Sequence, residues 1–392
     1  MFFAYFFYLS YAVIPKCIAT PEFVAIPSGY ELIQLHVIIN SGSHSPKNTF
    51  LIREKRGFWR CDSQDSYSPR MNVFPFDMPR SIHSIIDKRY SEYPPNCVLN
   101  DLTVEGMNQM HNLGLKYRKK LLAIDSKYFA EAKISQKFKV RSTYEDISFK
   151  NAVSFLTGLF NNEKIDDLEI ITGTKSKEVI VANEKFCEDI KKLVSEYDDT
   201  DECKQVISQA KDDLSHVLAY LYPNKESVKN PTKSQIINAC DFILSIYCNE
   251  QITDLNITNK LYEKAGKYYK KLNFDPFFLK SNVGIASATV IREITRTINN
   301  TITNKSDIKF SLLSGDDSTI AAILSLMKKK NVFIPLASHI SIALLKKGDI
   351  YYLHFAFNGN ILESSEFEKS IVSYDEFCKY LNNYSGFCHE LP

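Results

Sequence analysis

The sequence lacks the features that mark several large classes of protein. Its 48 Lys and Arg residues nearly balance 46 Asp and Glu residues, so the net charge of +2 gives no footprint for nucleic acid or a bilayer surface. There is a single Trp, and there is neither an internal repeat nor a low-complexity tract. With 44% hydrophobic and 24% charged residues, the composition excludes a disordered tail, a collagen-like fibre and a multi-pass membrane protein. A chain of 392 residues suits two domains, or one large core with a second lobe.

Long apolar runs are also scarce, and the one present lies at the N-terminus. Residues 2–14 carry no charge, and small residues follow up to Ala19. This run is shorter than the roughly 20 residues of a membrane-spanning helix. We therefore predict a signal peptide over residues 1–19, cleaved after Ala19, with an uncleaved anchor or a buried N-terminal strand as alternatives. The expected location is secreted, or the lumen of the secretory or lysosomal pathway, with no stable membrane span after cleavage.

Cysteines and glycosylation sequons fit that compartment. If Cys17 leaves with the signal, an even set of eight cysteines remains, which permits four disulfides of undecided pairing. The eight candidates are Cys61, Cys97, Cys187, Cys203, Cys240, Cys248, Cys378 and Cys388. The predicted glycosylation sites are Asn256, Asn299, Asn304 and Asn383.

Periodicity predicts an α/β chain interrupted by a helical stretch. Residues 30–39 and 308–313 read as buried strands, and residues 339–345 and 350–357 as a C-terminal meander ending in an Asn-Gly turn. A helix is expected from Thr103, and another capped by Ser148 with Phe149, Ala152 and Val153 on its apolar face. Residues 183–280 are dominated by charged amphipathic segments.

Two polar loops each follow a predicted buried strand. They cover residues 40–46 and 315–319. Ligands of open α/β sheets bind beyond the carboxyl ends of the strands, so both loops are expected to face one crevice.

The sequence around these loops resembles the histidine acid phosphatases, branch 2 of the histidine phosphatase superfamily. Five blocks occur in the family's order. These are Leu35–Pro46, Leu102–Gly114, Val140–Phe160, Ser314–Thr319, and Ile334–Ser338 with the strands that end at Asn358-Gly359. Trp59-Arg-Cys61 and Pro95-Asn-Cys97 further resemble the 2-phosphoxylose phosphatase branch.

This resemblance implies a doubly wound α/β fold with a mostly parallel sheet, flanking helices and a smaller helical cap domain. The α/β domain would comprise residues 23–182 and 281–392, and the cap domain residues 183–280. The resemblance implies no cofactor and no metal.

The positions that the resemblance makes catalytic are mostly replaced. The nucleophilic His of the family falls at Ser41, and the Arg before it at Asn40. The second Arg of the signature falls at His44, and the Arg of the third block at Ile147, although Arg141 lies nearby. The His of the His-Asp pair is Asp316, whereas the proton-donating Asp is retained as Asp317.

Physical chemistry indicates what these replacements do. A phosphomonoester carries close to two negative charges near neutral pH, and guanidinium groups bind it in bidentate geometry. A unit charge about 4 Å away is worth on the order of 4 kcal/mol at an effective dielectric near 20, so losing three Arg positions and gaining an Asp should abolish phosphate affinity. Without the nucleophile the family's covalent route is also lost.

We therefore expect a catalytically inactive pseudophosphatase that binds an unknown ligand or protein partner, and no nucleic acid. The main alternative is a phosphomonoester hydrolase that uses non-standard residues. Two further alternatives are a Ser hydrolase built from Ser41, His44 and Asp316 or Asp317, and a divalent metal held by His44, Asp316 and Asp317.

Overall fold

The structure is a computed structural model. It describes residues 16–48, 59–61, 97–130, 134–161, 163, 168–222, 229–251, 255–279 and 283–388. The apolar segment 2–14 and Pro95-Asn96 lie outside the described residues.

The expected α/β fold is confirmed, but the sheet is mixed and not mostly parallel as predicted. The strand order is β3-β2-β4-β1-β5-β6-β7, with β8 also paired to β6. Strands β3, β2, β4 and β1 are parallel, whereas the predicted C-terminal meander supplies the antiparallel half from β5 onward. The strands are β1 (Glu31–Ile39), β2 (Phe138–Ser142), β3 (Ile170–Thr172), β4 (Phe310–Ser314), β5 (His339–Lys347), β6 (Ile350–Phe357), β7 (Asn360–Ile361) and β8 (Ile371–Ser373).

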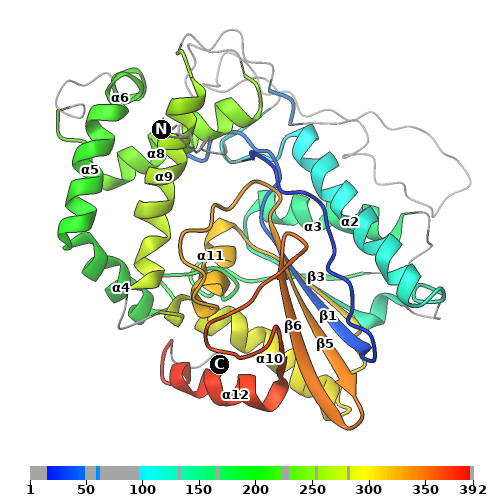
Figure 1. The fold of residues 1–392 in the computed structure, drawn as a ribbon. Coiled ribbons are helices and arrows are strands. Elements are labelled where there is room, and N and C mark those ends of the chain that lie inside the picture. Colours follow the sequence, from blue (N-terminus) through cyan, green and yellow to red (C-terminus); the bar gives the residue numbers. More distant parts are fainter. Residues whose placement is uncertain are drawn as a thin grey trace, which may run out of the picture.

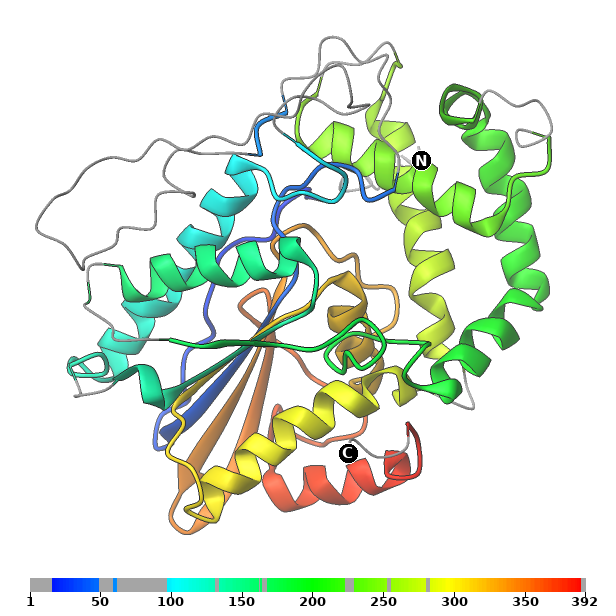
Figure 2. The same cartoon turned by 180° about the vertical axis from the view of Figure 1, so that it is seen from behind.

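Helices cover both faces of this sheet (Figures 1 and 2). They are α2 (Val104–Ile124) and α3 (Asp146–Phe160) on one face, and α10 (Ala288–Ile302), α11 (Asp317–Leu326) and α12 (Tyr374–Leu381) on the other. Strand β1 is buried on both sides because its side chains alternate between the two cores. Val37 and Ile39 pack toward α2 and α3, whereas Ile38 packs toward α10 and α11.

Two glycines let α2 and α3 cross in close contact. A Cβ atom on Gly114 would lie 2.0 Å from the carbonyl oxygen of Phe155, and one on Gly158 would lie 2.0 Å from that of His111. Helix α3 begins two residues before Ser148, so the prediction that Ser148 caps this helix is wrong. Phe149 is 45% exposed because α3 turns Ala152 and Phe155 toward the sheet instead.

The charged stretch in the middle of the chain forms helices, as expected. We call them the cap helices: α4 (Glu188–Asp198), α5 (Asp201–Asp213), α6 (Ser215–Leu221), α8 (Lys233–Cys248) and α9 (Asn259–Asn273). They enclose an apolar core of their own, which includes Leu214, Leu218 and Ile243 and also receives Trp59. Short 3-10 turns complete the described elements: η1 (Ile134–Lys137), η2 (Asp275–Phe278), η3 (Ile285–Ser287) and η4 (Asn382–Tyr384).

The prediction of four disulfides that exclude Cys17 is wrong. The structure pairs Cys17 with Cys248, Cys61 with Cys97 and Cys187 with Cys388. The cysteines left as free thiols are Cys203, Cys240 and Cys378. Cys17 reaches α8 because its segment is held against the core: the Leu336 N–H donates to the Cys17 carbonyl at 2.9 Å. Cys203 and Cys240 are instead buried among apolar side chains of the cap helices.

None of the helices within the described ranges is long and apolar enough to cross a membrane.

Candidate functional site

The two polar loops meet where two parallel strands end. Strands β1 and β4 are neighbours, and Ile39 lies opposite Ser314 in their register. The Gly315 N–H donates to the Ile39 carbonyl at 3.1 Å, which joins the start of one loop to the end of the other strand. The expectation that residues 40–46 and 315–319 face one crevice is therefore correct.

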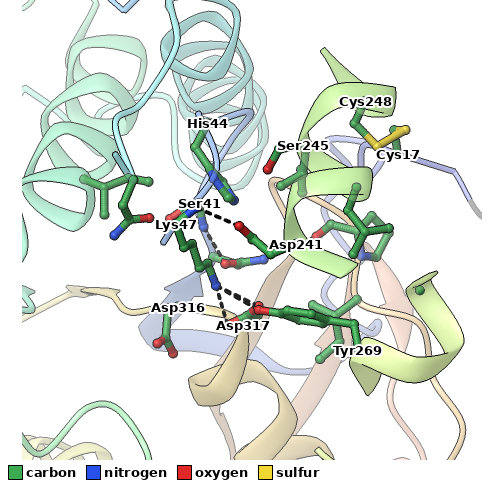
Figure 3. A pocket seen from close by; sticks show the side chains of 18 of the residues that line it. Cys17, Ser41, His44, Lys47, Asp241, Ser245, Cys248, Tyr269, Asp316 and Asp317 are labelled. Carbon is green, nitrogen blue, oxygen red and sulfur yellow. Dashed lines mark hydrogen bonds and ion pairs between the residues drawn. A yellow bond between two sulfur atoms is a disulfide. The ribbon is translucent and has the colours of Figure 1, made fainter. Parts of the chain in front are cut away.

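That crevice is a cavity of about 340 Å³ between the core loops and the cap helices (Figure 3). Six of the seven predicted site residues line it: Asn40, Ser41, His44, Ile147, Asp316 and Asp317. The seventh, Arg141, is not among the lining residues. Its guanidinium lies 3.5 Å from the fully buried carboxylate of Glu178, so it is not directed to the cavity as a substrate-binding group.

The loop after β1 is held rigidly by α2 and α3. Asn151 donates to the Ser41 Oγ at 3.0 Å and accepts the Gly42 N–H at 3.1 Å. Gly42 packs directly on Gly106 of α2, where a Cβ would lie 2.5 Å from the Gly106 carbonyl oxygen. Gln109 accepts the Ser43 N–H at 2.8 Å. These contacts from α2 and α3 fix the backbone of the loop.

Ser41 and His44 do not form a nucleophile–base pair. The His44 Nδ1 lies 2.7 Å from the Ser45 carbonyl, so Nδ1 carries the proton and Nε2 is an acceptor. Burial lowers the pKa of His44. Within the described part of the chain, no hydrogen bond joins Ser41 to His44, and the one bond at the Ser41 Oγ comes from Asn151. The Ser hydrolase alternative thus lacks its central contact.

Asp316 serves mainly to cap a helix. It precedes α11, and its Oδ1 accepts the Thr319 N–H at 3.1 Å and the Ser318 hydroxyl at 2.6 Å. Burial, together with the neighbouring charge of Asp317, raises the pKa of Asp316.

Lys47 is the site residue that the sequence analysis missed. Its Nζ lies 3.2 Å and 3.1 Å from the two carboxylate oxygens of Asp317 and 3.0 Å from the Tyr269 hydroxyl. Tyr269, from cap helix α9, donates to the Asp317 Oδ2 at 2.7 Å. The Lys47 backbone N–H donates to Asp241 of cap helix α8 at 2.6 Å. Lys47 follows Pro46, one residue beyond the resembled motif, and its partners come from three distant segments, so no local pattern indicates it.

This contact fixes the charge states of Lys47 and Asp317. Burial acts to raise the pKa of Asp317, but the Lys47 charge and the Tyr269 hydrogen bond outweigh burial and lower it. Burial acts to lower the pKa of Lys47, but Asp317 and the other acidic neighbours raise it well above its usual value. The pair is therefore an ammonium and a carboxylate.

The cavity has more carboxylates than available cations. Its acidic lining residues are Glu145, Asp241, Asp316 and Asp317, and its basic ones are Lys47 and Lys270. Lys270 is paired with Asp275 at 2.9 Å. Asp241 is only 5% exposed, and burial raises its pKa. Among the described residues it forms no ion pair with a Lys or Arg side chain.

The metal alternative finds no support in the cavity. In the described ranges, the one group of side chains with the geometry to hold an ion is Cys187, Asp189 and Cys388, far along the sequence from His44 and Asp316. Two of its three members form a disulfide, which leaves no thiolate ligand there.

Comparison with known proteins agrees with this architecture. The family described as "Histidine phosphatase superfamily (branch 2)" matches residues 80–358 of this chain. This stretch begins after the loop at 40–46. Counting factor 60 of Dictyostelium discoideum is 23% identical over 84% of this chain and 80% of its own length. Two probable acid phosphatases of that organism are each 22% identical, over 75% and 76% of this chain. This chain spans only 61% of their length.

Solved structures show the same fold at low identity. The apo phytase of Hafnia alvei has a TM-score of 0.57 and 12% identity, over 94% of this chain and 100% of its own. The phytase of Citrobacter braakii has a TM-score of 0.58 and 12% identity, over 90% and 98%. The finer resemblance to the 2-phosphoxylose phosphatase branch stays a prediction.

Proposed function

This chain belongs to branch 2 of the histidine phosphatase superfamily, and from that premise we propose that it is a pseudophosphatase: a member that binds a ligand or partner in its cavity without hydrolysing phosphomonoesters. One observation carries the proposal. The single acid retained from the family's catalytic set, Asp317, is held as a carboxylate by Lys47 and Tyr269.

The first reason is the missing nucleophile. The position that carries the attacking imidazole in the family is Ser41, whose hydroxyl has no base bonded to it among the described residues. A serine hydroxyl is a weak nucleophile unless a neighbouring base activates it. His44, the nearest imidazole in sequence, donates its proton to its own loop instead.

The second reason is the charge of the cavity. Phosphoryl transfer depends on positive groups that stabilise the equatorial oxygens. Lys47 is a cation in the cavity, but Asp317 already neutralises it at 3.1 Å. Asp241 and Asp316 would lie close to any bound phosphate and repel it.

The third reason concerns the leaving group. A general acid must carry a proton at the working pH. Lys47 and the Tyr269 hydroxyl lower the pKa of Asp317, so it is ionised across the range in which acid phosphatases would need it protonated. The retained residue is thus present without its function, which argues against the alternative of a hydrolase with non-standard residues.

Hydrolysis of an aryl phosphate and of phytate between pH 4 and pH 8 tests the proposal. We expect the wild-type protein to show the same background rate as Ser41→Ala and Asp317→Ala. An active relative with the intact Arg-His signature is the positive control. Turnover by the wild type that either variant abolishes would overturn the proposal and establish the hydrolase.

We also propose that the protein is secreted or luminal and glycosylated. Three disulfides join distant segments, which suits an oxidising compartment. The four sequon residues Asn256, Asn299, Asn304 and Asn383 are all exposed. The Cys17–Cys248 bridge favours signal cleavage before Cys17 rather than after Ala19, because the later cut would sever Cys17 from the chain that follows it.

A further inference from the structure

Two buried side chains offer polar atoms to the cavity without a partner. His44 is 7% exposed, and its Nδ1 is bound to Ser45, which leaves Nε2 without a partner among the described residues. Asp241 is 5% exposed; its Oδ2 accepts the Lys47 N–H, whereas its Oδ1 has no partner in the same ranges. Figure 3 shows both groups directed toward one space between the core loop and α8.

Both atoms can only accept hydrogen bonds. Burial lowers the pKa of His44, so the ring is neutral; its one proton lies on Nδ1, which donates to the Ser45 carbonyl, and Nε2 accepts. The ionised carboxylate of Asp241 likewise has no proton to give. A ligand that satisfies both must therefore donate. Neutral donors such as alcohols would do so, but they would leave the charge of Asp241 uncompensated.

The charge of the cavity selects a cation. The Lys47 ammonium is paired with Asp317 and the Lys270 ammonium with Asp275, so neither forms an ion pair with Asp241. A buried carboxylate without a cationic partner is costly, and a cation that enters beside it removes that cost. An ammonium group provides both the positive charge and up to three N–H donors in one compact group.

The walls of the cavity suit an organic cation better than a metal ion. Tyr262, Phe274 and Phe333 contribute aromatic surface to the cavity. Aromatic faces attract ammonium groups and pack against alkyl chains. The volume of about 340 Å³ lies at the small end of ligand sites, which limits the ligand to a short chain.

We propose that the cavity binds a small aliphatic amine in its ammonium form, with the ammonium held between the Asp241 carboxylate and the Nε2 of His44. This inference rests on the proposed function, because it names the ligand class of the same non-catalytic cavity. It assigns His44 and Asp241 to binding; the Lys47 N–H holds the Asp241 carboxylate in place, and the Ser45 carbonyl holds the His44 ring.

Isothermal titration of the full chain with diaminobutane tests the proposal. Butanediol is the neutral probe of matched length, and inorganic phosphate is the probe of opposite charge. We expect saturable binding of the diamine, and no saturable binding of the diol or of phosphate, at the same concentrations.

Two variants locate the binding. Asp241→Asn keeps the shape and the acceptor for the Lys47 N–H but removes the charge, and we expect at least about tenfold weaker diamine affinity. His44→Phe keeps a ring and removes Nε2, and we expect a smaller loss. Asp349→Asn, in the exposed turn between β5 and β6, is the matched control and should leave the affinity unchanged. Circular dichroism confirms that each variant is folded.

Three results would overturn the amine proposal: no diamine binding, equal binding of the diol, or diamine affinity unchanged in both Asp241→Asn and His44→Phe. Aryl phosphate turnover is measured on the same preparation. Absence of turnover with no amine binding would overturn the ligand class and leave the pseudophosphatase standing, whereas turnover that Asp317→Ala abolishes would overturn the pseudophosphatase itself.

Discussion

Lys47 and Asp317 join the two loops of the site and connect both to the cap helices. The Lys47 Nζ lies 3.1 Å from the Asp317 Oδ2, and both side chains contact the Tyr269 hydroxyl of α9. The backbone of Lys47 is bonded to Asp241 of α8. These contacts link the loop after β1, the start of α11 and two cap helices, so we expect the ion pair to contribute to the position of the cap as well as to the charge of the cavity.

Lys47→Met should destabilise the protein by about 2 kcal/mol. The substitution leaves the Asp317 carboxylate in the cavity without its cation, and breaking a buried pair from one side is strongly unfavourable. This loss is small for a broken buried ion pair, because the Lys47 side chain is 27% exposed and solvent weakens the interaction. Urea unfolding followed by circular dichroism measures the change.

A double variant distinguishes the contribution of the Lys47–Asp317 ion pair from the effect of removing the Lys47 side chain alone. Lys47→Met/Asp317→Asn removes both charges and should recover part of the stability lost in Lys47→Met. Lys116→Met, which breaks the more exposed pair with Glu22, should cost little by comparison. If Lys47→Met costs no more than Lys116→Met, the pair does not hold the cap.

Much of the fold followed from the sequence because strong local patterns agreed with the tertiary structure. The buried runs that became β1 and β4, and the Asn-Gly turn after β6, each carry their own signal. Helix α2 begins as predicted, since the Thr103 side chain accepts the Gly106 N–H. The position of the two polar loops then followed from the parallel pairing of their strands.

What the sequence did not reveal depends on contacts between distant segments. Cys17 was assigned to a removable leader by its neighbours, whereas the structure pairs it with Cys248, 231 residues away. Arg141 lies in a block that resembles the family, but its guanidinium is paired with the buried Glu178 and does not line the cavity. The pattern placed Phe149 on the buried face of its helix. The close crossing of α2 and α3 sets the orientation of α3 and leaves this ring exposed.

The Cys17–Cys248 bridge predicts the mature N-terminus. Non-reducing peptide mapping of protein secreted from a eukaryotic host should recover Cys17 joined to Cys248, and N-terminal sequencing should begin at or before Cys17. Cys17→Ser should lower the free energy of unfolding by about 2–4 kcal/mol, because the bridge constrains the unfolded chain. A mature chain that begins at Thr20 would contradict the bridge, and Cys378→Ser, at a free thiol, is the control.

Buried His36 predicts a loss of stability in acid. Burial, with a smaller effect of Lys139, lowers the pKa of His36 to about 3, against 6.5 in the unfolded chain. The unfolded state therefore binds the proton first, and stability falls as pH drops below 6.5 until the folded pKa is reached. Between pH 7 and pH 4.5 this group alone should cost about 2.5 kcal/mol, because the loss begins near pH 6.5 and then accrues at about 1.36 kcal/mol per pH unit.

The contribution of His36 is isolated by comparing how much stability each protein loses between pH 7 and pH 4.5. The free energy of unfolding is measured by urea titration at pH 7 and pH 4.5 for the wild type and for His36→Gln. The variant starts from a lower stability at pH 7, because it disturbs the contact with Gln34, but it should lose about 2.5 kcal/mol less on acidification. His216→Gln, which removes an exposed histidine, is the control variant. An equal loss of stability on acidification in all three proteins would refute the prediction.

Restoring positive charge at two positions should restore phosphate binding without restoring catalysis. In Asn40→Arg/His44→Arg, two guanidinium groups face the cavity from the loop after β1, and each is worth several kcal/mol to a phosphate oxygen at close range. We expect inorganic phosphate to bind at least about a hundredfold more tightly than to the wild type, as measured by isothermal titration. Aryl phosphate should remain intact, because Ser41 still has no activating base and Lys47 still holds Asp317 ionised. The neutral pair Asn40→Gln/His44→Gln controls for the change of shape, and equal phosphate affinity in both double variants would mean that charge is not what the cavity lacks.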